Sequence, residues 1–225
     1  MNIPALRQLI ESARLHEARH GTLARQLESR MQYLHPAICL PEEDALEVLT
    51  KFVDGYLEQV PELLEAAHAV ACEAGIEAQI KPVLKVAEHF FLSPPEMLEG
   101  QEGLAGLLDE AYLAHRLVEE INDRYIAFIG QPLIPLDTTV ANLIAHRLIG
   151  EDFANRLDEA VELAVSGLLG NSLSEQVSLD AYRARLSNPK TVAAWLAWPC
   201  LSRKFGVELQ LSRLGTMPVA LRAGR

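Results

Sequence analysis

Hydrophobic residues recur along most of the chain at the 3.6-residue spacing of an α-helix, so each such segment has one apolar face. The first segment covers residues 4–34, and we expect it to form one long amphipathic helix. The second begins at Pro41, whose fixed φ suits a first helical turn; its apolar stripe continues to Ala71, and Gly75 is expected to end the helix. Pro61 lies inside this second stripe, and we expect it to kink the helix or divide it in two.

The same pattern predicts further helices as far as residue 199. We expect them at about 76–92, 102–129, 137–148, 153–168, 172–186 and 188–199, with a short helical turn between 93 and 100. Ser93 and Ser172 each precede a glutamate by three residues, which is the spacing of a capping box. Asp137 is expected to cap the helix that follows it.

One segment near the C-terminus has the two-residue period of a β-strand. Apolar and polar residues alternate over 207–212, and residues 217–222 are the expected return strand of a hairpin. An isolated hairpin is marginally stable in water, so this one must pack on the helices or pair with another chain. The sequence therefore predicts an all-α, single-domain bundle of about seven to nine helices over residues 1–199. Residues 200–225 form a small hairpin or extended arm of the same domain.

The net charge of −11 is unevenly distributed along the chain. Residues 1–170 carry 12 basic and 28 acidic side chains, whereas residues 171–225 carry 8 basic and 3 acidic ones. Net negative charge disfavours binding to nucleic-acid phosphates, because that affinity comes from lysine and arginine. The asymmetry predicts that the basic C-terminal arm docks on an acidic helical surface, either of a second copy or of another protein.

The composition also bears on location. We see no stretch of about 18 uncharged apolar residues, so we expect no membrane span. Charged residues within the first twenty positions interrupt any apolar signal-peptide core. The three cysteines are widely spaced and form no C-x-x-C motif, which is typical of ordinary thiols in a reducing compartment. We therefore expect a cytoplasmic protein.

Pairs of histidine and glutamate on one helical face are the candidates for chemistry. Glu-x-x-His occurs twice, and His-x-x-x-Glu occurs on the helix over 102–129; this is a spacing used by helix bundles that bind metals through carboxylates. Iron, manganese or zinc would suit such ligands. The candidate ligands are Glu17, His20, Glu65, His68, His115 and Glu119.

Chance limits the weight of this pattern. With 23 glutamates and 7 histidines in 225 residues, about 0.7 occurrences of Glu-x-x-His are expected from composition alone, against the two observed. Glu17 and His20 are expected in the buried seam of the first helix, whereas Glu65 and His68 lie off the apolar stripe of the second. The string His16-Glu17-Ala18-Arg19-His20 also matches His-Glu-x-x-His, the zinc hydrolase motif, but no later segment supplies an obvious third ligand.

Two hypotheses of different class follow from the sequence. The first is a helical binding or interaction protein with no identifiable catalytic motif, which self-associates through its basic C-terminal arm. The alternative is a metal-dependent helical-bundle enzyme, an oxidoreductase of the ferritin-like di-metal carboxylate type or, with less support, a zinc hydrolase using His16.

Overall fold

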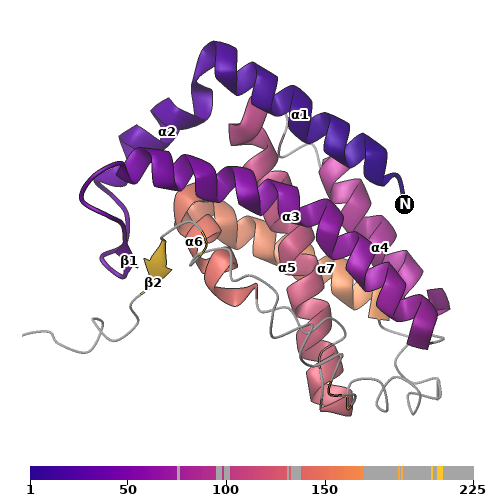
Figure 1. Cartoon of the computed structure of the whole chain (residues 1–225). Coiled ribbons are helices and arrows are strands. Elements are labelled where there is room, and N and C mark those ends of the chain that lie inside the picture. The colour runs from indigo at the N-terminus through magenta and orange to yellow at the C-terminus, as the bar shows by residue number, and fades with distance from the viewer. Residues whose placement is uncertain are drawn as a thin grey trace, which may run out of the picture.

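In a computed structural model the chain forms seven α-helices and two short strands within the residues that the structure describes (Figure 1). The described residues are 1–74, 77–94, 98, 102–130, 132, 138–169, 187, 189, 204 and 207–209. The elements are α1 (Ile3–His20), α2 (Thr22–Met31), β1 (Ile38–Cys39), α3 (Ala45–Ala74), α4 (Glu77–Leu92), α5 (Gly103–Ile129), α6 (Thr139–Ile149), α7 (Glu151–Leu169) and β2 (Glu208–Leu209). The predicted all-α multi-helix fold is confirmed.

Helix α5 is the centre of the fold, since it contacts each of the other described helices. Figure 1 shows α5 passing behind α3, with α1 and α2 along the upper edge and α6 and α7 below α3 in this view. Every residue over 104–115 is buried, polar residues included. A helix that is surrounded by neighbours loses its solvent-exposed face, so the core is organised around this segment.

The core itself is made of aliphatic and aromatic side chains from all seven helices. The largest fully buried side chains are Tyr56, Tyr112, Phe52, Phe91, Leu6, Ile10, Leu23, Leu27, Leu49, Leu57 and Leu63. They come from α1 to α5, so the layers formed by these helices share one apolar interior. Burial of such side chains contributes about 1.5–3 kcal/mol each and is the main force that holds the bundle together.

The first predicted helix is divided in two, which corrects the expectation of one helix over 4–34. Gly21 separates α1 from α2 and has φ +58, a left-handed conformation that glycine adopts without steric cost. Its amide donates to the carbonyl of Glu17, which ends α1. The apolar spacing continues in phase across this break, so periodicity alone did not reveal it.

The second helix begins four residues later than predicted. Pro41 lies in the loop before it, and α3 starts at Ala45, directly after Asp44 with its positive φ of 62. From there α3 continues as one helix with Pro61 inside it, so the proline does not divide it. Helix α6 begins after Thr138, its N-cap residue, and Asp137 lies outside the described residues.

The strand prediction near the C-terminus holds for its first part. Glu208 and Leu209 form β2, which pairs antiparallel with β1 in the connection between α2 and α3. Val207, just before β2, is fully buried. The expected return strand at 217–222 lies outside the described residues, as do the helix expected over 172–186 and all of the helix expected over 188–199 except position 189. Of the short turn expected at 93–100, the structure describes residues 93, 94 and 98.

Within the described part of the chain, each helix is too short or too polar to serve as a transmembrane segment.

Candidate functional site

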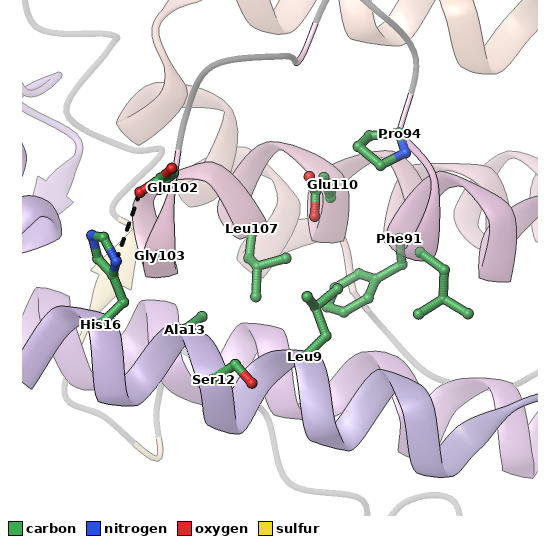
Figure 2. A pocket seen from close by; sticks show the side chains of 11 residues that line it. Leu9, Ser12, Ala13, His16, Phe91, Pro94, Glu102, Gly103, Leu107 and Glu110 are labelled. Carbon is green, nitrogen blue, oxygen red and sulfur yellow. Dashed lines mark ion pairs between the residues drawn. The ribbon is translucent and has the colours of Figure 1, made fainter.

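A cavity of about 320 Å³ lies between α1, the end of α4 and the first turns of α5 (Figure 2). Its volume is at the lower end of the range typical of small-molecule sites. Most of the residues that line the cavity are apolar or small, and a few are polar or charged. The lining residues are Leu9, Ser12, Ala13, His16, Phe91, Leu92, Pro94, Glu102, Gly103, Leu107 and Glu110.

Glu110 is the buried acid of this pocket. Its residue is only 9% exposed, and its Oε2 atom has no hydrogen-bond partner. Burial, together with the neighbouring charge of Asp109, raises the pKa of Glu110 to about 7. A buried polar atom without a partner is costly in a folded protein, so its retention calls for an explanation.

Asp109 adds a second acid beside the first. Burial raises the pKa of Asp109 to about 7 as well, although the positive charge of Arg30 opposes the shift. Arg30 itself donates to the carbonyl oxygens of Leu148 and Ile149 at the end of α6, so its charge is shared with that helix terminus. The interior of this end of the molecule is therefore richer in potential negative charge than in positive charge.

The outer end of the pocket is built on His16 and Gly103. The imidazole Nδ1 of His16 lies 3.9 Å from Oε2 of Glu102, whose side chain is 82% exposed (Figure 2). Gly103 has φ +74, and a Cβ atom there would come within 2.7 Å of the His16 ring. Seven residues of α5 separate Gly103 from Glu110, a rise of about 10 Å. The pocket thus has a polar, solvent-facing end and a buried acidic end.

A second polar region crosses the core between α3, α5 and α6. The hydroxyl of Tyr56 donates to Oδ1 of Asn142 at 2.7 Å, and Nδ2 of Asn142 donates to Oε2 of Glu119 at 2.5 Å. Arg116 donates from Nη1 to the same Glu119 oxygen at 2.5 Å. The groups at the centre of this region are therefore hydrogen-bonded to one another.

The same arginine continues this network to α7. Nε of Arg116 and the hydroxyl of Tyr112 each donate to Oδ1 of Asp158 at 2.9 Å. Burial would lower the pKa of Arg116, but its bonds to Asp158 and Glu119 outweigh that effect and raise it, so the guanidinium stays charged. Burial also raises the pKa of Tyr112 and keeps its hydroxyl protonated. We call Tyr56, Tyr112, Arg116, Glu119, Asn142 and Asp158 the α5 network.

His115 is fully buried next to this network, with its ring 4.2 Å from that of Tyr56. Its Nε2 lies 2.9 Å from the carbonyl oxygen of Tyr56, which only accepts, so Nε2 carries the proton and Nδ1 is an acceptor without a partner. Burial lowers the pKa of His115 to about 4. The ring is therefore neutral at physiological pH.

The predicted metal ligands of α1 have other partners or point to solvent. Glu17 accepts hydrogen bonds from the amides of Leu23 and Ala24 at 2.8 and 3.1 Å and from the Thr22 hydroxyl, so it caps the start of α2. Although burial opposes the shift, these hydrogen bonds lower its pKa. His20 is exposed, because α1 ends there rather than continuing in the buried seam as expected.

The remaining predicted ligands lie in three different settings, and that of His68 is described in the next paragraph. Glu65 is exposed and pairs with Arg7 at 3.0 Å, which agrees with its expected place off the apolar stripe. His115 and Glu119 belong to the buried region described above. The six predicted side chains therefore do not converge on one point, and the sequence-based set of ligands stays a prediction without a common centre.

One group of potential metal ligands does come together among the described residues. His68, Cys72 and Glu77 each offer a ligand atom, and these atoms lie within 4.8 Å of one another. His68 was a predicted ligand, whereas Cys72 and Glu77 were not. The cysteine is one turn after His68 on α3, and this spacing was visible in the sequence.

Sequence reasoning also missed the buried acid of the pocket, Glu110, and its neighbour Asp109. Asp109 and Glu110 interrupt a run of α5 that is otherwise apolar or small from residue 103 to 114, with Tyr112 the one hydroxyl-bearing side chain. Such a run is typical of a helix buried on all sides, and acids within it are unlike those of a solvent-facing stripe. That signal was available, but only the helix packing showed that a cavity adjoins Glu110.

Comparisons with protein-family models, with curated proteins and with solved structures each give no match to this chain.

Proposed function

We propose that this chain is a small-molecule-binding protein whose pocket takes an elongated apolar ligand with a cationic amine at the Glu110 end. The observation that carries the proposal is the unpartnered Oε2 of Glu110 in a largely apolar pocket. An ammonium group would donate to that oxygen and would be attracted by both Glu110 and Asp109. The proposal refines the binding-protein hypothesis drawn from the sequence.

The shape of the site supports an elongated ligand. Apolar side chains of α1, α4 and α5 line the space between the two ends of the pocket: Leu9, Ala13, Phe91, Leu92 and Leu107. An alkyl chain there would bury apolar surface at about 25 cal/mol per Å². The solvent-facing end at His16 and Glu102 would accommodate the tail terminus or a polar substituent.

The charge of the ligand decides how its affinity depends on pH. An amine needs Glu110 ionised, so its affinity should rise about tenfold between pH 6 and pH 8, across the pKa of about 7. A ligand that accepts a hydrogen bond from protonated Glu110, such as a carboxylate, should show the reverse dependence. The pH profile therefore separates the proposed class from its opposite.

Isothermal titration calorimetry with octylamine, 1-octanol and octanoate tests the proposal on the full chain. We expect octylamine to bind more tightly than octanol at pH 8, and Glu110→Gln to weaken octylamine by about 10- to 100-fold through loss of a charge-assisted bond. Octanol affinity should change little in that variant. Glu102→Gln at the exposed rim is the matched control and should leave octylamine affinity within about twofold.

Two outcomes would overturn the proposal. One is the absence of saturable binding of octylamine, and the other is octylamine affinity that is unchanged by Glu110→Gln.

The self-association through residues 200–225 stays a prediction, because nearly all of that segment lies outside the described residues. The cytoplasmic location predicted from the sequence also stays a prediction.

A further inference from the structure

The end of α3 and the start of α4 carry a cluster of three metal-binding side chains. His68 and Cys72 are one helical turn apart on α3, and Glu77 is the first residue of α4. His68 is half-buried and Cys72 is exposed, so an ion from solvent can reach them. None of the three belongs to the pocket or to the α5 network.

The distances within the cluster suit a tetrahedral ion. Sγ of Cys72 lies 3.8 Å from Nδ1 and 3.7 Å from Nε2 of His68. With metal–sulfur and metal–nitrogen bonds of about 2.3 and 2.0 Å and tetrahedral angles, two such ligand atoms are about 3.5 Å apart. The third ligand atom, a carboxylate oxygen of Glu77, lies within 4.8 Å of the other two.

The identity of the donors selects the kind of metal. A thiolate with an imidazole suits zinc, whereas calcium and magnesium prefer oxygen ligands alone. Glu65, which the sequence paired with His68, is held by Arg7 at 3.0 Å and is not part of this group. The partner of His68 in this cluster is therefore Cys72 rather than Glu65, which the sequence pattern had predicted.

We propose that His68, Cys72 and Glu77 bind a zinc ion that joins the end of α3 to the start of α4. Three protein ligands leave the fourth tetrahedral position to water or to an external ligand, which is the arrangement of open zinc sites. The site is independent of the proposed amine pocket, so either can fail without affecting the other. Because the ion binds only when both helix ends are in place, it stabilises the folded chain.

Titration of the full chain with cobalt(II), followed by absorption spectroscopy, tests this assignment. Cobalt reports thiolate ligation by a sulfur-to-metal charge-transfer band and tetrahedral geometry by intense visible bands. We expect both signals to saturate at one equivalent and to disappear when zinc is added. Thermal unfolding should shift to higher temperature with zinc present.

Variants identify the ligands. Cys72→Ser should abolish the charge-transfer band, whereas Cys39→Ser, which alters another described free cysteine, should retain it. Glu77→Gln and His68→Asn should each lower the affinity for zinc by about a hundredfold or more. Loss of a residue that only hydrogen-bonds to a metal ligand already lowers metal affinity by about 10- to 100-fold. Circular dichroism is the control for folding, and we expect the variants to keep the wild-type helical signal because the changed positions are exposed or half-buried.

The proposal is overturned if cobalt does not bind at one equivalent or if the charge-transfer band persists in Cys72→Ser. It is also overturned if zinc affinity is the same in His68→Asn and wild type.

Discussion

The two sides of the central helix α5 differ in whether their buried polar groups have hydrogen-bond partners. On the side of α3, α6 and α7, the α5 network pairs Arg116 with Glu119 and Asp158 and satisfies the hydroxyls of both tyrosines. On the side of α1 and α4, Glu110 lines a cavity, and its buried Oε2 has no hydrogen-bond partner. Glu110 and the α5 members of the network, Tyr112, Arg116 and Glu119, lie within ten residues of each other on one helix.

The difference separates polar groups that support the fold from polar groups available to a ligand. A buried network in which each charge has its partners holds helices in one arrangement, and losing one member leaves the others unpaired. A buried carboxylate beside a cavity lowers stability until something binds it. Mutations in the two regions should therefore change stability in opposite directions.

The largest expected effect is in the network. Arg116→Ala removes the cation that joins Glu119 and Asp158, and we expect it to lower the free energy of unfolding by about 2–4 kcal/mol. The loss is smaller than for a fully buried pair because the three side chains are 15–31% exposed. Urea unfolding followed by circular dichroism measures it.

Arg124→Ala is the control for this loss. Arg124 pairs with Glu120 one turn away on the same helix, at 3.0 Å and with 44% of the arginine side chain exposed. A surface pair of this kind is worth about 0–1 kcal/mol. Equal losses in the two variants would show that the network is not a structural unit.

The next effect is in the pocket and has the opposite sign. The folded-state pKa of Glu110 is raised from 4.5 to about 7, so its contribution to stability is fully present below about pH 4.5 and is lost as pH rises to about 7. Glu110→Gln removes this loss, and we expect it to stabilise the protein by about 1–3 kcal/mol at pH 8 in the absence of ligand. Urea unfolding at a series of pH values measures the change.

His115 makes the same measurement more discriminating, because its effect on the pH dependence of stability has the opposite sign to that of Glu110. Its pKa is lowered from 6.5 to about 4, so its contribution is present above about pH 6.5 and is lost as pH falls to about 4. In Glu110→Gln, stability should therefore rise more steeply with pH between 4 and 6.5 than in wild type. Parallel pH curves for the two proteins would contradict the assignment of the buried acid.

The smallest effect compares two hydroxyl groups. Tyr56→Phe leaves Oδ1 of the buried Asn142 without its donor, and we expect a loss of about 1–2 kcal/mol. Ser12 lines the pocket, but its hydroxyl donates to the carbonyl of Gln8 on its own exposed helix face, so Ser12→Ala should change stability by less than about 0.5 kcal/mol. If Tyr56→Phe and Ser12→Ala lowered the free energy of unfolding by similar amounts, the hydroxyl groups of the network and of the pocket would not differ in their contribution to stability.

Local patterns predicted much of this architecture. The helical period located α4, α5 and α7 to within about two residues at each end, because each helix buries a continuous apolar face. The break at Gly21 was not predictable from that period, because apolar residues remain in phase on both sides of it. There the left-handed glycine and the Glu17 carboxylate, which caps α2, determine where α1 ends.

The candidate sites were less accessible to such reasoning. The α5 network joins Tyr56 to Asn142 across 86 positions of sequence and Arg116 to Asp158 across 42. Histidine and glutamate spacing singled out His115 and Glu119, but as ligands rather than as members of a buried polar region. The same spacing found His68 and missed Cys72, which lies close to Glu77 at the start of α4.

The sequence by itself determined that the chain folds into helices and which face of each is buried, because side chains a few residues apart encode both. It also determined the acidic character of the helical body. Only the tertiary structure decided that α5 is central, that Glu110 adjoins a cavity while Arg116 is paired with two acids, and that three potential ligands meet where α3 ends and α4 begins. Those properties depend on which helices pack side by side, and the period of a single helix carries no information about its neighbours.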